Sequence, residues 1–149
     1  MVYYQLIVHQ LEVILIKLSI RSKEKEIIEF LEKLKNILQS EEFNLDRDFT
    51  IVKSNKKNGK EKFSTKYTLL DLDYDASDIV ERLKELTIRE YSETLVDKDD
   101  VNPPLLFVFG KDINDKQIYI KLKIKGSQTG HVLCVSFHYA EERMSFPYS

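Results

Sequence analysis

The sequence predicts an α+β domain in which N-terminal helices pack on a small C-terminal antiparallel β-sheet. Segments with apolar residues at helical spacing fill much of the chain before residue 100. Three strand-like stretches then follow one another closely, at 106–111, 117–124 and 132–138, and the middle one alternates apolar and polar residues without a break. Such alternation is typical of a sheet with one buried face and one polar face.

The bulk composition indicates one globular domain. The chain has 149 residues, of which 42% are hydrophobic and 32% charged, so a sizeable core is expected. The net charge of −2 argues against a protein that binds nucleic acid over its whole surface. The charges are segregated, however, because residues 71–104 hold eleven acids and four bases whereas residues 53–66 hold six lysines and one glutamate. A local basic patch of this kind suits phosphate binding.

The cysteine content and the N-terminus bear on location. The one cysteine of the sequence, Cys134, lies in an apolar strand, so we expect it in the core of a cytoplasmic protein without disulfides. Residues 6–20 are mostly apolar, with Glu12 and Lys17 as interruptions. The run is too short to cross a bilayer and lacks the features of a signal peptide, so no membrane association is expected. Residues 1–21 are therefore an apolar extension, either an extra helix packed on the domain or a partner, or a segment that precedes the true start. Residues 22–149 form the single domain.

The first predicted helix runs from a Ser22 cap to about Ser40. A short strand at 49–52 and a basic loop at 53–62 follow, and Asn58–Gly59 within this loop is a turn signal. The inner face of the helix is expected to consist of Ile27, Leu31, Leu34 and Leu38.

Two further helical segments are marked by their first residues. Thr68 with Asp71 resembles a capping box and predicts one or two helical turns. Asp75 or Ser77 then begins a longer helix. The inner face of that helix is expected to consist of Ile79, Val80, Leu83 and Leu86.

A second capping box precedes the sheet. Thr87 with Glu90 predicts a further short helix that carries Tyr91 and Leu95. The Pro103–Pro104 pair then interrupts the chain before the first strand of the sheet.

The register of the last two strands can be predicted from their apolar residues. These are even-numbered in 118–124 and odd-numbered in 133–137. Residues opposite one another in a ladder share a face, so paired numbers must sum to an odd value near 255 or 257. Either register brings Tyr119, Lys121 and His138 together on the polar face.

This cluster suits RNA cleavage without a metal ion or other cofactor. Histidine can take the proton from a ribose 2′-OH near neutral pH, lysine can stabilise the extra charge on the phosphate, and tyrosine can stack on a base or donate a hydrogen bond. An ordinary solvated sheet face, with lysines for solubility, remains the alternative explanation. The Asp71–Asp75 segment is not a calcium loop, because Ala76 and Arg82 stand where glycine and glutamate are required.

The chain also resembles the MqsR-type toxins of type II toxin–antitoxin systems, which belong to the RelE-like mRNA interferase superfamily. The resemblance spans residues 22–149 and rests on the strands 107–111, 117–124 and 135–138 and on the upstream segment 83–91. It implies a RelE-like α+β fold, a cytoplasmic mRNA endoribonuclease, and inhibition by a cognate antitoxin, for which a helix-turn-helix protein is expected.

The family's functional residues carry over only in part. Tyr119 and Tyr91 match its two tyrosines, whereas Ser92, Leu106 and His138 stand where it has lysine, glutamine and lysine. His138–Tyr139 instead resembles the C-terminal His-Tyr of other RelE-like toxins, in which the histidine moves the proton. Lys111 is expected to replace the lost upstream charge.

The predicted site therefore has a catalytic group and an RNA-binding group. The catalytic group consists of His138, Tyr119 and Lys121. The RNA-binding group consists of Lys111, Tyr91, Lys123, Lys56, Lys57 and Tyr139.

The alternative function is that of a non-catalytic domain of the same fold, which binds nucleic acid, the ribosome or another protein.

Overall fold

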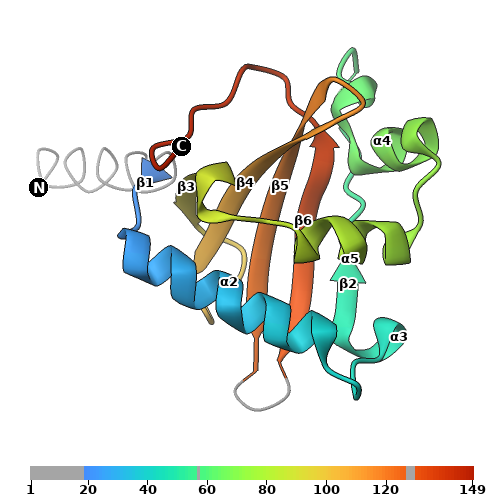
Figure 1. Cartoon of the computed structure of the whole chain (residues 1–149). Coiled ribbons are helices and arrows are strands. Elements are labelled where there is room, and N and C mark those ends of the chain that lie inside the picture. The colour runs from blue at the N-terminus through green and yellow to red at the C-terminus, as the bar shows by residue number, and fades with distance from the viewer. Residues whose placement is uncertain (1–18, 57, 127–129) are drawn as a thin grey trace, which may run out of the picture.

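The computed structural model describes residues 19–56, 58–126 and 130–149. Within them the chain has an α+β fold, with N-terminal helices packed on a mostly antiparallel six-stranded sheet (Figure 1). The strand order is β1-β3-β4-β5-β6-β2, and β2 runs parallel to β6. The strands are β1 Ser19–Ile20, β2 Phe49–Ile51, β3 Tyr91–Val96, β4 Leu105–Ile113, β5 Lys116–Lys125 and β6 His131–Tyr139.

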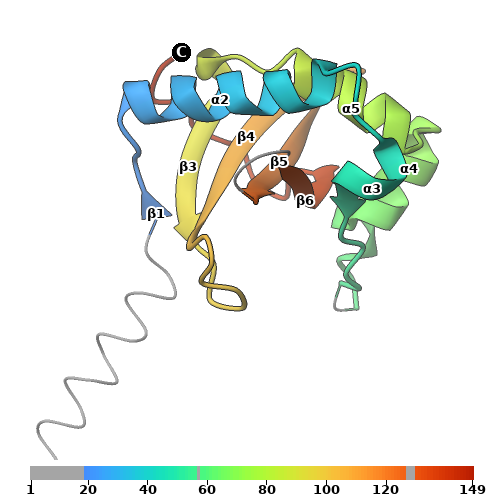
Figure 2. The same cartoon turned by 90° about the horizontal axis from the view of Figure 1, so that it is seen from below.

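Among the described residues, helices cover one face of this sheet and none covers the other (Figure 2). The helices are α2 Glu24–Gln39, α3 Leu45–Asp48, α4 Thr65–Leu72 and α5 Ala76–Lys84, with short 3₁₀ turns η1 Glu61–Phe63 and η2 Ile88–Glu90. The core lies between α2, α5 and the sheet, where the predicted inner faces of both helices are buried as expected. In the ranges that the structure covers, no helix has the length and apolar character needed to span a bilayer.

Helix α2 begins one residue later than the sequence suggests. Lys23 precedes its first turn, and Ser22 does not cap it. The Ser22 side chain is buried and shares a 2.7 Å hydrogen bond with the hydroxyl of Thr94 in β3. Because Ser19–Ile20 also pair with β3, the end of the apolar extension belongs to the sheet.

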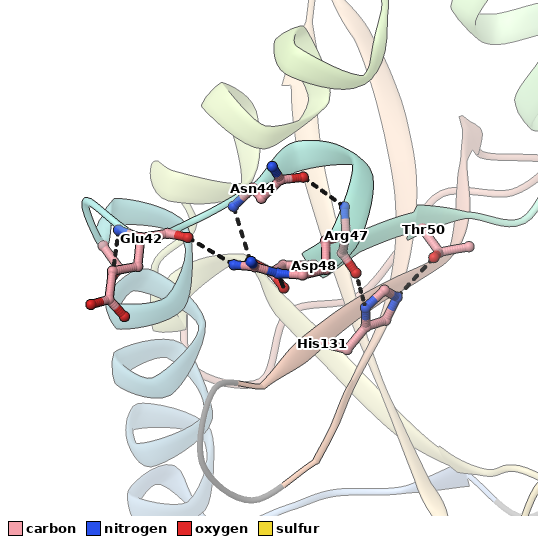
Figure 3. A network of polar contacts seen from close by, with 7 residues as sticks. Glu42, Asn44, Arg47, Asp48, Thr50 and His131 are labelled. Atoms are coloured by element: carbon pink, nitrogen blue, oxygen red, sulfur yellow. Dashed lines mark hydrogen bonds and ion pairs between the residues drawn. The ribbon is translucent and has the colours of Figure 1, made fainter.

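A polar network joins α3 to the start of β6 (Figure 3). Asn44 caps α3 by accepting a hydrogen bond from the backbone N–H of Arg47, whose side chain in turn holds the carboxylate of Asp48. The Nδ1–H of His131 donates to the carbonyl of Arg47 over 3.0 Å, and its Nε2 accepts from the hydroxyl of Thr50 over 2.8 Å. Both ring nitrogens of His131 are thus used for structure.

The capping predictions for α4 and α5 have different outcomes. Ser64, not Thr68, caps α4, and the Thr68 hydroxyl inside the helix accepts a hydrogen bond from the Tyr139 backbone. The Thr68 prediction is therefore wrong, because a hydroxyl that serves β6 imitates a cap in the sequence. Asp75, one of the two expected first residues, caps α5. It also forms a capping box with Asp78, which was not predicted from the sequence.

The Thr87 capping box is present, but it opens the single 3₁₀ turn η2 and not an α-helix. Tyr91 then begins β3, and Leu95 lies within this strand, so the predicted short helix is wrong after its first turn. Strand pairing with β4 and β1 outweighs the local helical signal here.

The register of β5 and β6 follows the prediction for half its length. Ile118 to Lys121 pair with residues 139 to 136, so the numbers sum to 257. A β-bulge then leaves Val135 without a partner, and from Leu122 onward the sum is 256. Because one extra residue reverses the alternation, Val132 and Cys134 enter the core. The prediction that Leu133 and Val135 are core residues is wrong, whereas that for Phe137 and Cys134 is confirmed.

Candidate functional site

The uncovered face of the sheet carries a cavity of about 930 Å³. We call this side of the sheet the open face and define it by Tyr119, Lys121, Ser136 and His138, all of which line the cavity. The β5–β6 register makes Tyr119 the direct partner of His138 and Lys121 the partner of Ser136. The cavity is also lined by β1 and the residue after it, by β3, by the basic loop and by the C-terminal segment 140–147. The residues from the first three of these elements are Ser19, Ile20, Arg21, Ser92, Glu93 and Lys56.

The rings of Tyr119 and His138 stack on one another. Their centroids are 5.1 Å apart and the ring planes differ by 13°. The Lys121 ammonium lies 5.7 Å from the centroid of the Tyr119 ring, close enough for a cation–π interaction. The structure therefore brings together the three side chains that the register predicts.

His138 is held in one tautomer. Its Nδ1 lies 2.9 Å from the carbonyl oxygen of Tyr139, which can only accept a hydrogen bond, so the proton of the neutral ring sits on Nδ1. Nε2 then keeps its lone pair and can accept a proton. Burial lowers the pKa of His138 below its ordinary value, and the positive charges of Lys56 and Lys121 lower it further. The imidazole is therefore neutral at physiological pH.

The neighbours of His138 are held as proton donors or cations. Burial, with a smaller contribution from the charge of Glu93, raises the pKa of Tyr119 to about 12, so its phenol keeps its proton. Burial also lowers the pKa of Lys121, with Lys56 adding to the effect. The ordinary pKa of a lysine side chain is 10.5, so Lys121 stays mostly charged near neutral pH unless its pKa falls by several units.

The cavity has charges of both signs, but its acids are partly engaged. Glu141 forms an ion pair with Lys60 at 3.1 Å, and Glu93 accepts a hydrogen bond from Ser19 over 2.6 Å. The four bases at the cavity have no ion-pair partner within 4.0 Å among the described residues. These bases are Arg21, Lys56, Lys121 and Arg143.

The C-terminal segment forms one wall of the cavity. It crosses from the end of β6 to the side of the sheet where β1 lies (Figure 1). The backbone N–H of Met144 donates to the side-chain oxygen of Gln117 over 2.8 Å, and the Ser92 hydroxyl donates to the carbonyl of Ser145 over 2.8 Å. Phe146 lies against Gly110, where a Cβ atom would come within 2.7 Å of its ring. A glycine in β4 is therefore required for the segment to pack this closely.

Two residues of the predicted RNA-binding group lie on the helix-covered face. Lys111 pairs with Ile118 and forms ion pairs with Glu85 and Glu90 at 3.4 and 3.3 Å. Tyr139 also pairs with Ile118, is buried, and donates a hydrogen bond from its hydroxyl to Asp71. The structure therefore does not bring these two side chains together with His138, because a strand directs neighbouring side chains to opposite faces.

Two other predicted contacts are buried. Tyr91 has no exposed surface, and its hydroxyl accepts from the Ser22 backbone N–H over 3.0 Å. Lys123 lies on the open face, but its side chain has no exposure and its ammonium donates to Asp97 over 2.7 Å. Neither side chain is therefore exposed at the cavity.

The basic loop contributes more directly than the sequence suggests. Lys56 lines the cavity together with His138, whereas Lys57 lies outside the described residues. Arg143 and Glu93 also line the cavity, and sequence reasoning missed both. Arg143 follows the last strand in a segment without periodicity, and Glu93 lies in a strand that a helical signal precedes. Their proximity depends on long-range packing.

Among the residues that the structure describes, no group of three or more His, Cys, Asp or Glu side chains is placed to hold a metal ion. Comparison with protein-family models, with curated proteins and with solved structures finds no match. The function must therefore be argued from the geometry of the open face.

Proposed function

We propose that the protein is a metal-independent endoribonuclease that cleaves mRNA through attack of a ribose 2′-OH on the adjacent phosphate. The observation that carries the proposal is the stacked Tyr119–His138 pair beside Lys121. The same cavity is lined by three further basic side chains that form no ion pair with any described residue. A neutral imidazole with a free Nε2, a protonated phenol and an ammonium group are together sufficient for this chemistry.

Each group has a role in the proposed reaction. Nε2 of His138 takes the proton of the 2′-OH, and the 2′ oxygen forms a new bond to phosphorus. Lys121 stabilises the additional negative charge on the phosphate oxygens. The bond to the 5′ oxygen then breaks, and the Tyr119 phenol or the Lys121 ammonium supplies the proton that the leaving oxygen needs. The products are a 2′,3′-cyclic phosphate and a free 5′-OH.

The flanking bases complete the proposed RNA-binding surface. Arg143 and Lys56 border the cavity, and they take the place of the sequence-predicted Lys111 and Lys123. We assign them to phosphate contacts outside the scissile position. Such contacts supply affinity that weakens with salt.

The resemblance to MqsR-type toxins supports this proposal through Tyr119 and the strands of the open face, and no longer through Tyr91, which is buried. On this basis the protein is a toxin of a type II toxin–antitoxin system that acts in the cytoplasm, and its partner is an antitoxin. A non-catalytic binding module of the same fold is the alternative outcome of the test.

The test is cleavage of RNA by the purified chain, alone and with ribosomes. The His138→Ala variant should lose roughly 10²- to 10⁴-fold in rate, the usual contribution of a general acid or base. Lys121→Ala should also lose activity, whereas Lys111→Ala, which removes a lysine from the opposite face, should retain it if its melting temperature is unchanged. Full activity of a folded His138→Ala variant would refute the mechanism. Failure of the wild type to cut any RNA would favour the binding module.

A further inference from the structure

An acidic loop lies on part of the lysine row of the open face. Lys121, Lys123 and Lys125 follow one another on this side of β5. The connection between β3 and β4, residues 97–104, lies next to the last two. It projects from the sheet on the side opposite α2 and α5 (Figure 2).

The contacts between this loop and the lysines are short. The Lys123 ammonium donates to the Asp97 carboxylate over 2.7 Å and to the carbonyl of Asp100 over 2.8 Å. The Lys125 ammonium donates to the Asp100 carboxylate over 2.5 Å. Lys121 has no ion pair within the described part of the chain. The loop thus neutralises two of the three lysines and leaves the one nearest His138.

The two neutralised lysines differ in their surroundings. Lys123 has no exposed side-chain surface, so its pair with Asp97 is part of the fold. Lys125 and Asp100 are 42% and 40% exposed, so a solute can reach this pair. The hydrogen bond from Lys125 lowers the pKa of Asp100 to about 2, so the carboxylate stays charged at any physiological pH. The Asp100 carboxylate is therefore a permanent negative charge bound to the exposed Lys125 ammonium.

We propose that Asp100 is an internal competitor for RNA phosphate: it fills an anion-binding subsite at Lys125 and so confines bound RNA to the end of the open face near Lys121 and His138. The proposal rests on the proposed function. A carboxylate and a phosphodiester oxygen make the same charge-assisted hydrogen bond to an ammonium group. Lys125 lies four residues beyond Lys121, roughly 13 Å along the strand, so it would contact a different phosphate.

Asp100→Asn tests this with little disturbance of the loop. The Asp100 side chain also accepts a hydrogen bond from the Asn102 backbone N–H through Oδ1, which asparagine can preserve. The hydrogen bond from Lys123 to the Asp100 carbonyl and the pair of Lys123 with Asp97 do not involve the changed group. At Lys123 the substitution removes only the longer ion pair with the Asp100 carboxylate, at 3.6 Å. Asp99→Asn is a matched control, because it removes the same charge from the same loop while Asp99 forms no ion pair among the described residues.

The measurement is the affinity for a fluorescent single-stranded 2′-O-methyl oligoribonucleotide, which lacks the attacking hydroxyl, between 50 and 200 mM salt. One additional phosphate contact steepens the slope of log affinity against log salt by about 0.7 for a single strand. The affinity ratio of Asp100→Asn to wild type should therefore grow roughly 2.5-fold when salt falls from 200 to 50 mM. Asp99→Asn should keep the wild-type slope, and Asp100→Asn/Lys125→Gln should return to it.

The outcomes separate this inference from the proposed function. If the wild type binds the oligonucleotide and the salt slopes of Asp100→Asn and Asp99→Asn are equal, Asp100 does not compete with RNA phosphate. That result would leave the ribonuclease proposal standing. A steeper slope that persists without Lys125 would also overturn the competitor. If neither wild type nor any variant binds the oligonucleotide, the competitor is overturned, and the cleavage test alone decides the ribonuclease proposal.

Discussion

Replacing Asp97 by Asn should destabilise the fold by about 3 kcal/mol, because it leaves a buried ammonium group without its main counter-ion. The side chain of Lys123 has no exposed surface and Asp97 is 12% exposed, so water cannot replace the lost carboxylate easily. Removing one partner of a buried pair typically costs about 3–5 kcal/mol. We expect the lower end, because the Asp100 carbonyl at 2.8 Å and its carboxylate at 3.6 Å remain near the ammonium.

Urea unfolding followed by circular dichroism measures this loss. For a chain near 150 residues, about 3 kcal/mol corresponds to a fall of roughly 6–12 °C in melting temperature. Asp99→Asn, which changes the same charge on the same loop, should stay within about 0.5 kcal/mol of wild type. Asp97→Asn/Lys123→Met should recover most of the loss, since a well-packed apolar replacement of a buried pair is often neutral. Equal stability of Asp97→Asn and Asp99→Asn would show that Lys123 does not depend on this pair.

Two further perturbations test the site. Gly110→Ala should lower the free energy of unfolding by about 1–3 kcal/mol and increase proteolysis after residue 140. The added Cβ atom would lie 2.7 Å from Phe146 and 2.8 Å from Met144. Unchanged protease resistance would contradict the packing of the C-terminal segment on Gly110. The pH profile of kcat/KM should have an acid limb below the ordinary histidine pKa of about 6.5, since the neutral imidazole is the active form and burial lowers its pKa. Lys56→Met should move that limb to higher pH by removing a nearby positive charge, and an unmoved limb would mean that another group titrates.

The sequence predicts helices α2 and α5 and the end of the sheet that carries Tyr119 and Lys121, because these parts have clear local patterns. The inner faces of α2 and α5 are set by apolar periodicity, and the strict alternation of residues 118–124 places Tyr119 and Lys121 together. The register predicted from this alternation is wrong beyond Lys121, where β6 has a bulge at Val135. Nothing in the alternation of β6 indicates this bulge. Register can therefore be predicted only up to the bulge.

The sequence could not place every candidate site residue, because the exposure of a side chain depends on partners far away in sequence. Strand β4 is apolar on both faces, so nothing in it indicates that Lys111 faces α5. Lys123 has the alternation of a solvent-facing residue, yet Asp97, 26 residues earlier, buries it. Arg143 reaches the cavity only because the C-terminal segment folds back over Gly110.

The chemistry of the RNA ends tests the central claim most directly. The purified protein is incubated with a labelled oligoribonucleotide and with its 2′-O-methyl counterpart, and the product ends are identified by mass spectrometry. The open-face mechanism predicts 2′,3′-cyclic phosphate and 5′-OH ends from the first substrate and no cleavage of the second, with both products strongly reduced for His138→Ala. Cleavage of the 2′-O-methyl strand, or products with 5′-phosphate and 3′-OH ends, would contradict attack by the 2′-OH.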